Sequence, residues 1–306
     1  MKVLTIIVTY NGMKWLDRCL GSLRTSSVPS DVLVVDNGST DGSPAYIQEH
    51  FPEVMLHCTG ENLGFGKANN IGLQKALAEG YDYVYLLNQD AWVFPDTFAR
   101  LISAMVAAPE YGILSPMQLT ASQDKMDPRF VRWCPETAWE QWKACAGESC
   151  SWEPGYGERA FDLAEVHTVK FVMAAHWMIS RACFAKVGGF SPAFPHYGED
   201  DNYIHRALYH GFKCGILSSA GAVHDREMRQ MTKEASMRLK CVASVVKVSN
   251  PLNCFVSRCL LQPLELLAIS TRYRSASVFK YIFKLIGSYG RLKAIRAQSK
   301  NDAAFL

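Results

Sequence analysis

The sequence predicts an α/β fold in which a mostly parallel central sheet is flanked by helices and followed by a helical C-terminal extension. Apolar runs of strand length alternate with helically spaced apolar residues through positions 1–226, which is typical of parallel strands joined by helices. Three of these runs end in polar loops, the usual place for a binding crevice in such a sheet. Positions 227–306 keep only the helical spacing.

Five strands are expected in the first part of the chain, each from a short and strongly apolar run. They cover residues 3–8, 31–35, 54–57, 84–87 and 113–118. Apolar residues at helical spacing predict helices between and after them. These helices centre on residues 15–23, 45–47, 71–77 and 98–105.

The strand at 84–87 organises the rest because it stops on the polar triplet Asn88-Gln89-Asp90. Open α/β sheets bind ligands at the carboxyl ends of their strands, so we expect Asp90 to face a crevice. A hard divalent cation that arrives with a diphosphate needs only one or two carboxylates, since phosphate oxygens and water complete its coordination. Asp90 could equally well cap the turn that precedes the next helix. The triplet alone does not decide between a metal ligand and a turn cap.

Polar loops also follow the first two strands, at Thr9–Gly12 and at Asp36–Ser43. In a parallel sheet these loops and the triplet lie along one edge and converge on one crevice. Gly64-Phe65-Gly66 does not continue as GxGxxG, and no GxxxxGK[ST] occurs in the sequence. A dinucleotide-binding fold or a P-loop is therefore poorly supported.

Three consecutive acids, Glu199, Asp200 and Asp201, stand where a helix is expected to begin. Acids at that position complement the helix dipole, but this role needs only one of them. Adjacent carboxylates repel one another, which raises a pKa and suits a general base.

Four ordered segments of the first half carry a resemblance to a known family. They are Val8–Asn11, Val34–Gly42, Asn62–Gly66 and Leu87–Asp90. In this order and spacing they resemble the donor-binding half of family 2 glycosyltransferases of the GT-A fold, a Rossmann-like nucleotide-diphospho-sugar transferase fold; the rhamnosyltransferase-like branch is nearest in style. The resemblance covers roughly residues 2–117. It implies a catalytic domain at 1–226, with a donor half at 1–117 and an acceptor half at 118–226.

The resemblance implies that the strand-end loops and the segment 62–67 bind a nucleotide-sugar donor. The donor-binding residues would be Thr9, Tyr10, Asn11, Asp36, Asn62, Gly64, Lys67, Asn88, Gln89 and Asp90. Asp90 would bind Mg²⁺ or Mn²⁺ on the diphosphate, and a neutral His224 after the last core strand would complete the coordination, with Asp225 orienting its other ring nitrogen. The alternative for His224 is a surface histidine. The family usually has an acid where Asn88 stands, which implies a weaker or more substrate-dependent metal site.

The segment Glu199–Arg206 resembles the family signature Glu-Asp-x-Asp-x-x-x-Arg, with Asn202 in place of the second Asp. By that match, Asp200 is the catalytic base that deprotonates the acceptor hydroxyl, and Glu199 supports it. Asp201 and Arg206 would bind the acceptor. His176 would join them, because it lies in a small-residue segment that the family places beside the acceptor. As a lone histidine, His176 also fits a structural role.

The C-terminal extension at 227–306 holds fourteen Lys and Arg against four Asp and Glu, whereas the rest of the chain is net acidic. Helices are expected at 228–248, 251–269 and 277–296, with breaks at Pro251 and Pro263. No apolar run is long enough to span a bilayer. A basic amphipathic helix can lie on an anionic membrane surface; a helical cap on the catalytic domain or a homodimer contact is the equal alternative.

These observations predict a metal-dependent, inverting glycosyltransferase that moves a sugar from a UDP- or dTDP-sugar to a hydroxyl of a glycan or lipid-linked saccharide, in cell-envelope polysaccharide biosynthesis. Ten scattered cysteines without a CxxC pair, and no secretory leader, favour a reducing cytoplasm. The tail would then bind the inner face of the cell membrane, and no nucleic-acid partner is expected. A sugar nucleotidyltransferase would need a Gly-rich basic loop after the first strand, which is missing. Asn88 and Asn202 keep a catalytically inactive sugar- or membrane-binding relative as the other alternative.

Overall fold

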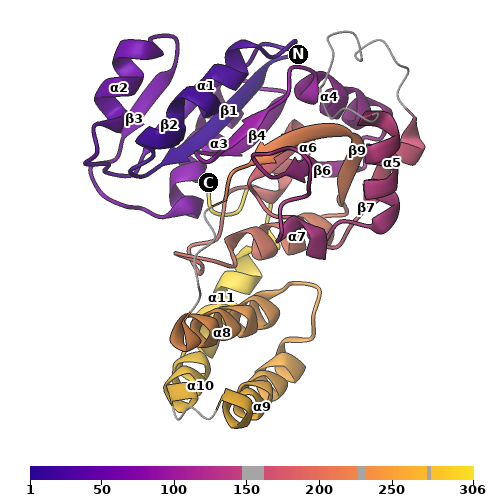
Figure 1. Cartoon of the computed structure of the whole chain (residues 1–306). Coiled ribbons are helices and arrows are strands. Elements are labelled where there is room, and N and C mark those ends of the chain that lie inside the picture. Colours follow the sequence, from indigo (N-terminus) through magenta and orange to yellow (C-terminus); the bar gives the residue numbers. More distant parts are fainter. Residues whose placement is uncertain (147–161, 227–231, 274–276) are drawn as a thin grey trace.

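The protein consists of a lobe built on one central sheet and a smaller helical lobe beneath it (Figure 1). The computed structural model describes residues 1–146, 162–226, 232–273 and 277–306. In these residues the strands form one nine-stranded sheet with the order β3-β2-β1-β4-β8-β6-β9-β5, and β7 pairs with β9. The expected α/β sheet with a helical C-terminal extension is confirmed.

The first part of the sheet is parallel, as the alternation of strands and helices predicts. It contains β1 (Val3–Thr9), β2 (Asp31–Asp36), β3 (Met55–Cys58) and β4 (Tyr83–Asn88). The register pairs Thr9 with Asp36 and Val8 with Asn88. The polar residues at the ends of β1, β2 and β4 therefore lie side by side at one edge of the sheet.

Beyond β4 the sheet becomes mixed. It contains β5 (Ala91–Val93), β6 (Tyr111–Leu119), β7 (Val166–Thr168), β8 (His176–Ser180) and β9 (Lys213–His224). β8 runs antiparallel to both β4 and β6, whereas β6 and β9 are parallel. β5 is antiparallel to β9 and pairs Ala91 with His224. This pairing brings the residue after Asp90 beside the end of β9.

Helices cover both faces of the sheet. They are α1 (Leu16–Arg24), α2 (Ser43–His50), α3 (Phe65–Ala78), α4 (Thr97–Ala107), α5 (Glu136–Ala146), α6 (Arg181–Val187) and α7 (Glu199–Tyr209). One buried cluster joins Leu4, Ile6 and Leu86 to α3, α6 and α7. The other joins Ile7 and Leu87 to α1 and α4. Alternate strand residues thus enter opposite cores, which explains why these strands are apolar without interruption.

The extension is a helical lobe with its own small core. It comprises α8 (Lys233–Ser249), α9 (Phe255–Tyr273), α10 (Ser277–Gly287) and α11 (Tyr289–Gln298). The expected start of its first helix, at 228–231, lies outside the described residues. The single helix expected at 277–296 is wrong: it divides at Ser288, whose hydroxyl donates to the carbonyl of Leu285 at 2.6 Å.

The break expected at Pro263 is also wrong, because Pro263 lies inside α9. A proline cannot donate to the carbonyl four residues earlier, here that of Cys259. The hydroxyl of Tyr289 on α11 donates to this carbonyl at 2.6 Å. A bond from another helix thus replaces the missing one, and α9 continues through the proline.

The last residues return from the helical lobe to the sheet lobe. Ala303 N–H donates to the carbonyl of Lys186, and Gly189 N–H donates to that of Ala304 at 2.8 Å. The Lys186 ammonium also pairs with Asp302 at 2.7 Å. These bonds attach the end of the extension directly behind α6, close to the segment that leads into α7.

Candidate active site

Asp36, at the end of β2, is held in a fixed orientation by hydrogen bonds to one carboxylate oxygen, while the other oxygen has none. Its Oδ2 accepts the backbone N–H groups of Gly38 and Ser39 at 3.1 and 3.0 Å. Its Oδ1 is buried and has no hydrogen-bond partner in the described structure, and the same holds for Oδ1 of Asn37. Two buried acceptors without donors, at a sheet edge where ligands bind, are suited to the N–H and O–H groups of a ligand.

Most of the other predicted donor-binding side chains hold the loops together. Gln89 Oε1 accepts from the Thr9 hydroxyl at 2.8 Å and from Tyr10 N–H at 2.9 Å. Asn11 Oδ1 accepts from Thr40 N–H at 2.9 Å, and Asn62 Oδ1 accepts from Gly64 N–H at 2.9 Å. Tyr10 is about half exposed, and Lys67 is exposed on the first turn of α3. In this structure, Thr9, Asn11, Asn62 and Gln89 thus fix the loops at this edge of the sheet.

The glycines of the segment 62–67 allow it to lie against the chain that leads into α7. Gly64 has φ of +79°, and a Cβ built on it would lie 2.5 Å from the carbonyl oxygen of Pro195. A Cβ at Gly66 would lie 2.9 Å from the Cβ of Phe190 and 3.8 Å from that of Glu199. The predicted donor segment and the acid triplet therefore meet, although they are distant in the sequence.

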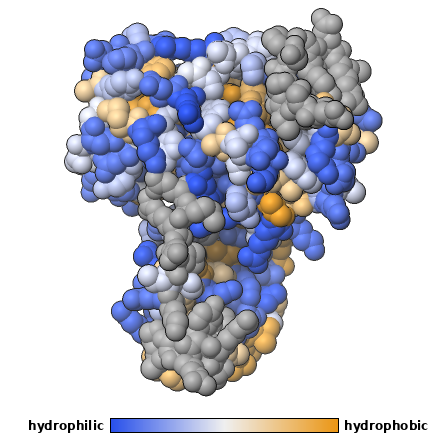
Figure 2. All heavy atoms as spheres, viewed as in Figure 1, coloured by the Kyte–Doolittle hydropathy of each residue, from blue (hydrophilic) through white to orange (hydrophobic). Residues whose placement is uncertain are grey.

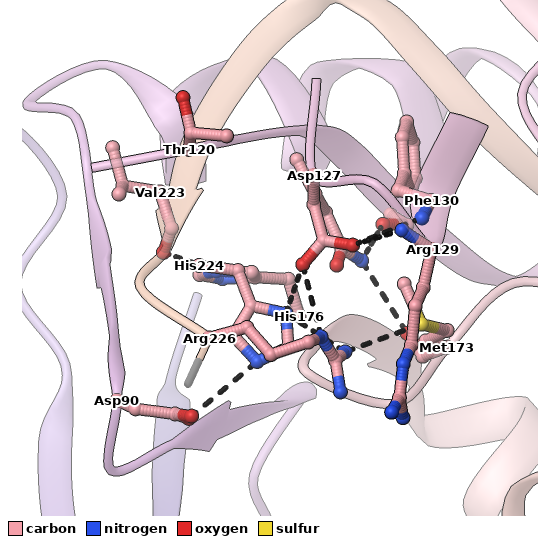
Figure 3. Close-up of polar contacts among 12 residues, drawn as sticks. Asp90, Thr120, Asp127, Arg129, Phe130, Met173, His176, Val223, His224 and Arg226 are labelled. Atoms are coloured by element: carbon pink, nitrogen blue, oxygen red, sulfur yellow. Dashed lines mark hydrogen bonds and ion pairs between the residues drawn. The ribbon is translucent and has the colours of Figure 1, made fainter. Parts of the chain in front are cut away.

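Asp90 and His224 converge from two strand ends (Figure 3). Asp90 lies in the turn between β4 and β5, and its carbonyl accepts Asp225 N–H at 2.8 Å. His224 ends β9, and its Nε2 lies 3.5 Å from Asp90 Oδ1. The Asp90 side chain keeps 22% of its surface exposed, against 1% for His224. The pair predicted as the metal site is thus adjacent, with the carboxylate toward solvent.

Asp127 is a functional candidate that the sequence did not reveal. It lies after β6, is fully buried, and accepts His224 Nδ1 and Arg226 Nε on Oδ2, both at 3.2 Å. Its Oδ1 accepts the backbone N–H groups of Arg129 and Phe130. The residue expected to orient His224 was Asp225, and this is a correction: Asp127 holds the ring nitrogen. The local sequence at Asp127, directly before Pro128, indicates only a turn.

The cluster is strongly polarised. Burial alone would raise the pKa of Asp90 and of Asp127, but the hydrogen bonds and charge of His224 lower both. Burial would lower the pKa of His224, and its bonds to Asp127 and Asp90 raise it. Without a cation, the two carboxylates favour the protonated form of His224, whereas the neutral form was predicted for His224 as a metal ligand. A cation at this position would replace that proton, since a metal ligand must be neutral imidazole.

His176 is buried and holds the end of β9 in place. Its Nε2 donates to the carbonyl of Val223 at 3.0 Å, and its Nδ1 accepts from the Tyr85 hydroxyl at 2.9 Å. Burial lowers its pKa to about 3, so the ring is neutral. The side chain has no exposed surface, and the expectation that it contacts an acceptor gives way to the structural role.

The acid triplet opens α7, where Gly198 at φ of +84° turns the chain into the helix. Burial and the neighbouring Asp200 raise the pKa of Glu199 to about 8 and that of Asp201 to about 7. Burial also raises the pKa of Asp200. Its carboxylate accepts backbone N–H groups from Asp201 and Ala174. All three acids at the start of α7 are partly buried, and each holds its proton to a higher pH than an exposed acid does.

The Arg226 guanidinium links the two acidic groups. It contacts Asp127 and His224, and its charge lowers the pKa of Asp90 against the effect of burial. The same charge opposes the rise in the pKa of Asp200 that burial causes. One cation therefore acts on residues from the turn after β4, from the turn after β6 and from α7.

Arg206 is the signature residue that the structure places away from any acceptor. It is fully buried and donates to the carbonyls of Val187, Gly189 and Ala304. Its guanidinium also lies 4.7 Å from the centre of the Phe305 ring. Instead of binding an acceptor, Arg206 joins α7 to the end of α6 and to the C-terminal residues.

A sequence model described as glycosyl transferase family 2 matches residues 5–188, more than half of the chain. The chain belongs to this family. The family suggested by the strand-end motifs is thus confirmed, and with it the expectation of a glycosyltransferase enzyme.

Curated relatives of this family 2 glycosyltransferase have related names. It is 28% identical over 233 residues to an N-acetylglucosaminyl-diphospho-decaprenol L-rhamnosyltransferase of Mycobacterium tuberculosis, across 72% of this chain and 75% of that protein. It is 38% identical over 112 residues to an undecaprenyl-phosphate mannosyltransferase of Micrococcus luteus, across 35% of this chain and 46% of that protein. The first name agrees with the rhamnosyltransferase-like branch, and both names fit envelope glycan synthesis.

Solved structures confirm the GT-A fold. The crystal structure of S. aureus TarS 1–349 superposes with a TM-score of 0.57 at 15% identity, covering 96% of this chain and 83% of TarS. The mannosyltransferase PcManGT from Pyrobaculum calidifontis, in complex with GDP-Man and Mn²⁺, gives a TM-score of 0.51 at 16% identity, covering 97% and 86%. At such low identity the likeness shows the fold alone. No helix among the described residues has the length and apolar character needed to cross a bilayer.

Proposed function

We propose that this family 2 glycosyltransferase moves a sugar from a UDP- or dTDP-sugar to a hydroxyl of a lipid-linked saccharide, with inversion at the anomeric carbon. The observation that carries the proposal is the position of Arg226, which touches the Asp127–His224 pair and Met173, while the backbone N–H of the next residue, Ala174, donates to Asp200. A diphosphate centre at Asp90 and a proton acceptor at Asp200 would then share one crevice. A single displacement needs both groups in place at once.

The nucleoside would bind at the ends of β1 and β2. The unpartnered Oδ1 atoms of Asp36 and Asn37 offer acceptors to its N–H and O–H groups. Tyr10 is 48% exposed beside them, and its ring can stack on a base. The loop bonds through Gln89 and Asn11 keep these groups fixed before the donor arrives, which lowers the entropy lost on binding.

Mg²⁺ or Mn²⁺ would be held by Asp90 Oδ1 and His224 Nε2. These atoms are 3.5 Å apart, close to the separation of about 3 Å expected for neighbouring ligands of one such cation. Asp127 would fix the tautomer and orientation of His224. Metal-bound histidines are commonly held in this way by a carboxylate at the ring nitrogen that does not bind the metal. When bound, the cation supplies positive charge to the departing diphosphate. Complexes of two structural neighbours with Mn²⁺ support this assignment.

Asp200 would act as the base. Its carboxylate takes the proton of the acceptor hydroxyl while the hydroxyl oxygen bonds to C1 of the donor sugar. The bond between C1 and the diphosphate oxygen breaks, and its electron pair leaves with the nucleoside diphosphate. Burial raises the pKa of Asp200, which makes it a stronger base than an exposed aspartate. Bonds from Asp201 and Ala174 N–H hold the carboxylate in position.

A lipid-linked acceptor agrees with an exposed apolar surface on the helical lobe, which we call the apolar stripe. It consists of Val256, Leu260 and Leu264 on α9, and Phe279, Phe283 and Ile286 on α10. Figure 2 shows apolar atoms along the outer side of this lobe. Leu260 is 67% and Phe283 72% exposed. Large exposed apolar patches on soluble proteins usually mark an interaction site, so the apolar stripe is a candidate contact surface. The enzyme would lie with this stripe on the inner face of the cell membrane.

Calorimetric titration with UDP and dTDP, with and without Mn²⁺, tests the donor site. Mn²⁺ is expected to tighten binding of one nucleotide to the wild type and to have little effect on Asp90→Asn. Hydrolysis of the matching sugar nucleotide without acceptor then separates an active enzyme from an inactive relative. Absence of metal-linked binding for both nucleotides contradicts the donor assignment, and absence of both hydrolysis and transfer contradicts the reaction.

A further inference from the structure

A cavity of about 410 Å³ lies between the two lobes. One wall is the segment 193–197, which leads directly into α7, and the other walls are α8, α10 and α11. Val242, Val245 and Leu285 give it an apolar lining. The cavity is separate from the Asp90–His224 pair, and neither residue lines it.

Four cations line the cavity, and no acid does. They are Arg238, Lys280, Lys284 and Arg291. None forms an ion pair with a carboxylate in the described part of the chain; Arg291 donates to the carbonyl of Pro192 at 3.3 Å. Cations that converge on a partly apolar space without a counter-charge are suited to an anionic group carried by an apolar ligand.

The cavity adjoins the helix end that carries the proposed base. Gly198 directly precedes Glu199 and Asp200, and a Cβ built on it would lie 2.8 Å from both Val242 Cγ1 and Val246 Cγ2 of α8. The backbone at the start of α7 therefore packs against the cavity wall. A ligand bound in the cavity would place a sugar beside the start of α7, the helix that carries Asp200.

The apolar stripe continues from the cavity along the same helix. Lys280 and Lys284 line the cavity and are exposed, and their neighbours Phe279 and Phe283 on α10 are exposed as well. An anionic group in the cavity and a hydrocarbon chain on the stripe would thus lie on adjoining sides of α10, because consecutive helix residues point about 100° apart. This arrangement matches a lipid whose charged linkage joins a saccharide to a long apolar chain.

We propose that this cavity binds the phosphate or diphosphate that links the acceptor saccharide to its polyprenyl chain. The inference rests on the proposed function, because it gives the acceptor of that reaction its binding subsite. The four cations neutralise the linkage, the apolar lining and the stripe receive the lipid, and the start of α7 receives the sugar. Recognition of the linkage would also select lipid-linked acceptors over free saccharides.

Binding of farnesyl diphosphate, a short soluble mimic of the lipid linkage, tests the cavity. The variant Lys280→Ala/Lys284→Ala is expected to raise its Kd by roughly tenfold or more, because two charge-assisted contacts are lost. The control Lys240→Ala/Lys293→Ala removes the same charge from exposed positions of α8 and α11 that do not line the cavity. It is expected to keep the Kd within about twofold. Val245→Trp, which fills the cavity, is expected to weaken farnesyl diphosphate and leave nucleotide binding unchanged.

The outcomes separate the cavity from the reaction. Equal weakening by the cavity and control variants, or inorganic diphosphate binding as tightly as farnesyl diphosphate, overturns the assignment to a lipid linkage. If farnesyl diphosphate binds the wild type more tightly than Lys280→Ala/Lys284→Ala but the enzyme turns over no sugar nucleotide, the cavity assignment is supported and the proposed reaction is contradicted. If Lys280→Ala/Lys284→Ala transfers sugar to a polyprenyl-linked acceptor with an unchanged acceptor KM, the proposed reaction is supported and the role of the cavity is contradicted.

Discussion

His224 Nδ1 lies 3.2 Å from the buried carboxylate of Asp127, while its Nε2 lies 3.5 Å from that of Asp90. The histidine is therefore oriented by one acid and directed at another. Asp127 has both oxygens occupied by four donors, so it is held rigidly. Such a partner fixes which ring nitrogen can bind a cation.

Asp127→Asn is expected to weaken Mn²⁺ binding by roughly 10–100-fold, the usual cost of removing a partner that orients a metal-bound histidine. Calorimetry with Mn²⁺ in the presence of UDP or dTDP measures the change. Asp225→Asn is the matched control, because Asp225 is half-buried and its backbone N–H is the group that bonds to the cluster, at the carbonyl of Asp90. Equal Mn²⁺ affinities for the two variants would show that Asp127 does not act on the metal site.

Asp200→Asn is expected to lower the transfer rate by a factor on the order of 10²–10⁴, the range for loss of a general base. Nucleotide binding is expected to stay unchanged, since Asp36 and Asp90 are retained. Initial rates at saturating donor, together with a nucleotide titration, measure both effects. A variant with the wild-type rate would remove Asp200 from the mechanism.

The pH dependence follows from the raised pKa values at the start of α7. A base with a raised pKa stays protonated to a higher pH, so kcat/KM is expected to rise with pH over a range above that of an ordinary aspartate. Asp201 has its pKa raised to about 7 by burial and by Asp200, and the two titrate as a pair. Asp201→Asn removes the second charge, so the rising limb is expected to move to lower pH. A limb unchanged in this variant would contradict the coupling.

Arg206→Met tests the structural role of the signature arginine. The substitution leaves the carbonyls of Val187 and Gly189 buried without donors, and we expect a loss of about 2–4 kcal/mol in the free energy of unfolding. Urea denaturation measures it. Lys125→Met at an exposed position is expected to change stability by less than about 0.5 kcal/mol. A stable Arg206→Met variant with a raised acceptor KM would instead restore the acceptor-binding role.

Co-sedimentation with vesicles containing phosphatidylglycerol tests the apolar stripe. Leu264→Ser/Phe283→Ser removes two exposed apolar side chains, each worth about 1.5–3 kcal/mol when buried. The fraction bound is therefore expected to fall strongly. Val106→Ser, at a 60% exposed position on α4 of the sheet lobe, should leave it unchanged. Equal binding of both variants would place the membrane contact elsewhere or exclude it.

The sequence by itself determined the parallel first part of the sheet, its polar edge and the family. Apolar runs gave β1, β2, β3 and β4 to within a residue or two at either end, because a strand buried on both faces needs uninterrupted apolar residues. Asp90 and the acids of α7 were recognisable because they belong to short motifs at element ends. Apolar runs and short motifs are local features of the sequence, so they can be recognised without knowledge of the fold.

Only the tertiary structure decided which side chains meet. Asp127 orients His224, and His176 and Arg206 are buried supports, because strand order and packing bring distant segments together. Pro263 stays within α9 because a hydroxyl from α11 satisfies the freed carbonyl. The cavity is enclosed by the segment 193–197 and by helices of the C-terminal extension, which are far apart in the sequence. A local pattern carries no information about such long-range contacts. The family resemblance paired Asp90 with His224, but nothing in the sequence named Asp127 or Arg226 as their partners.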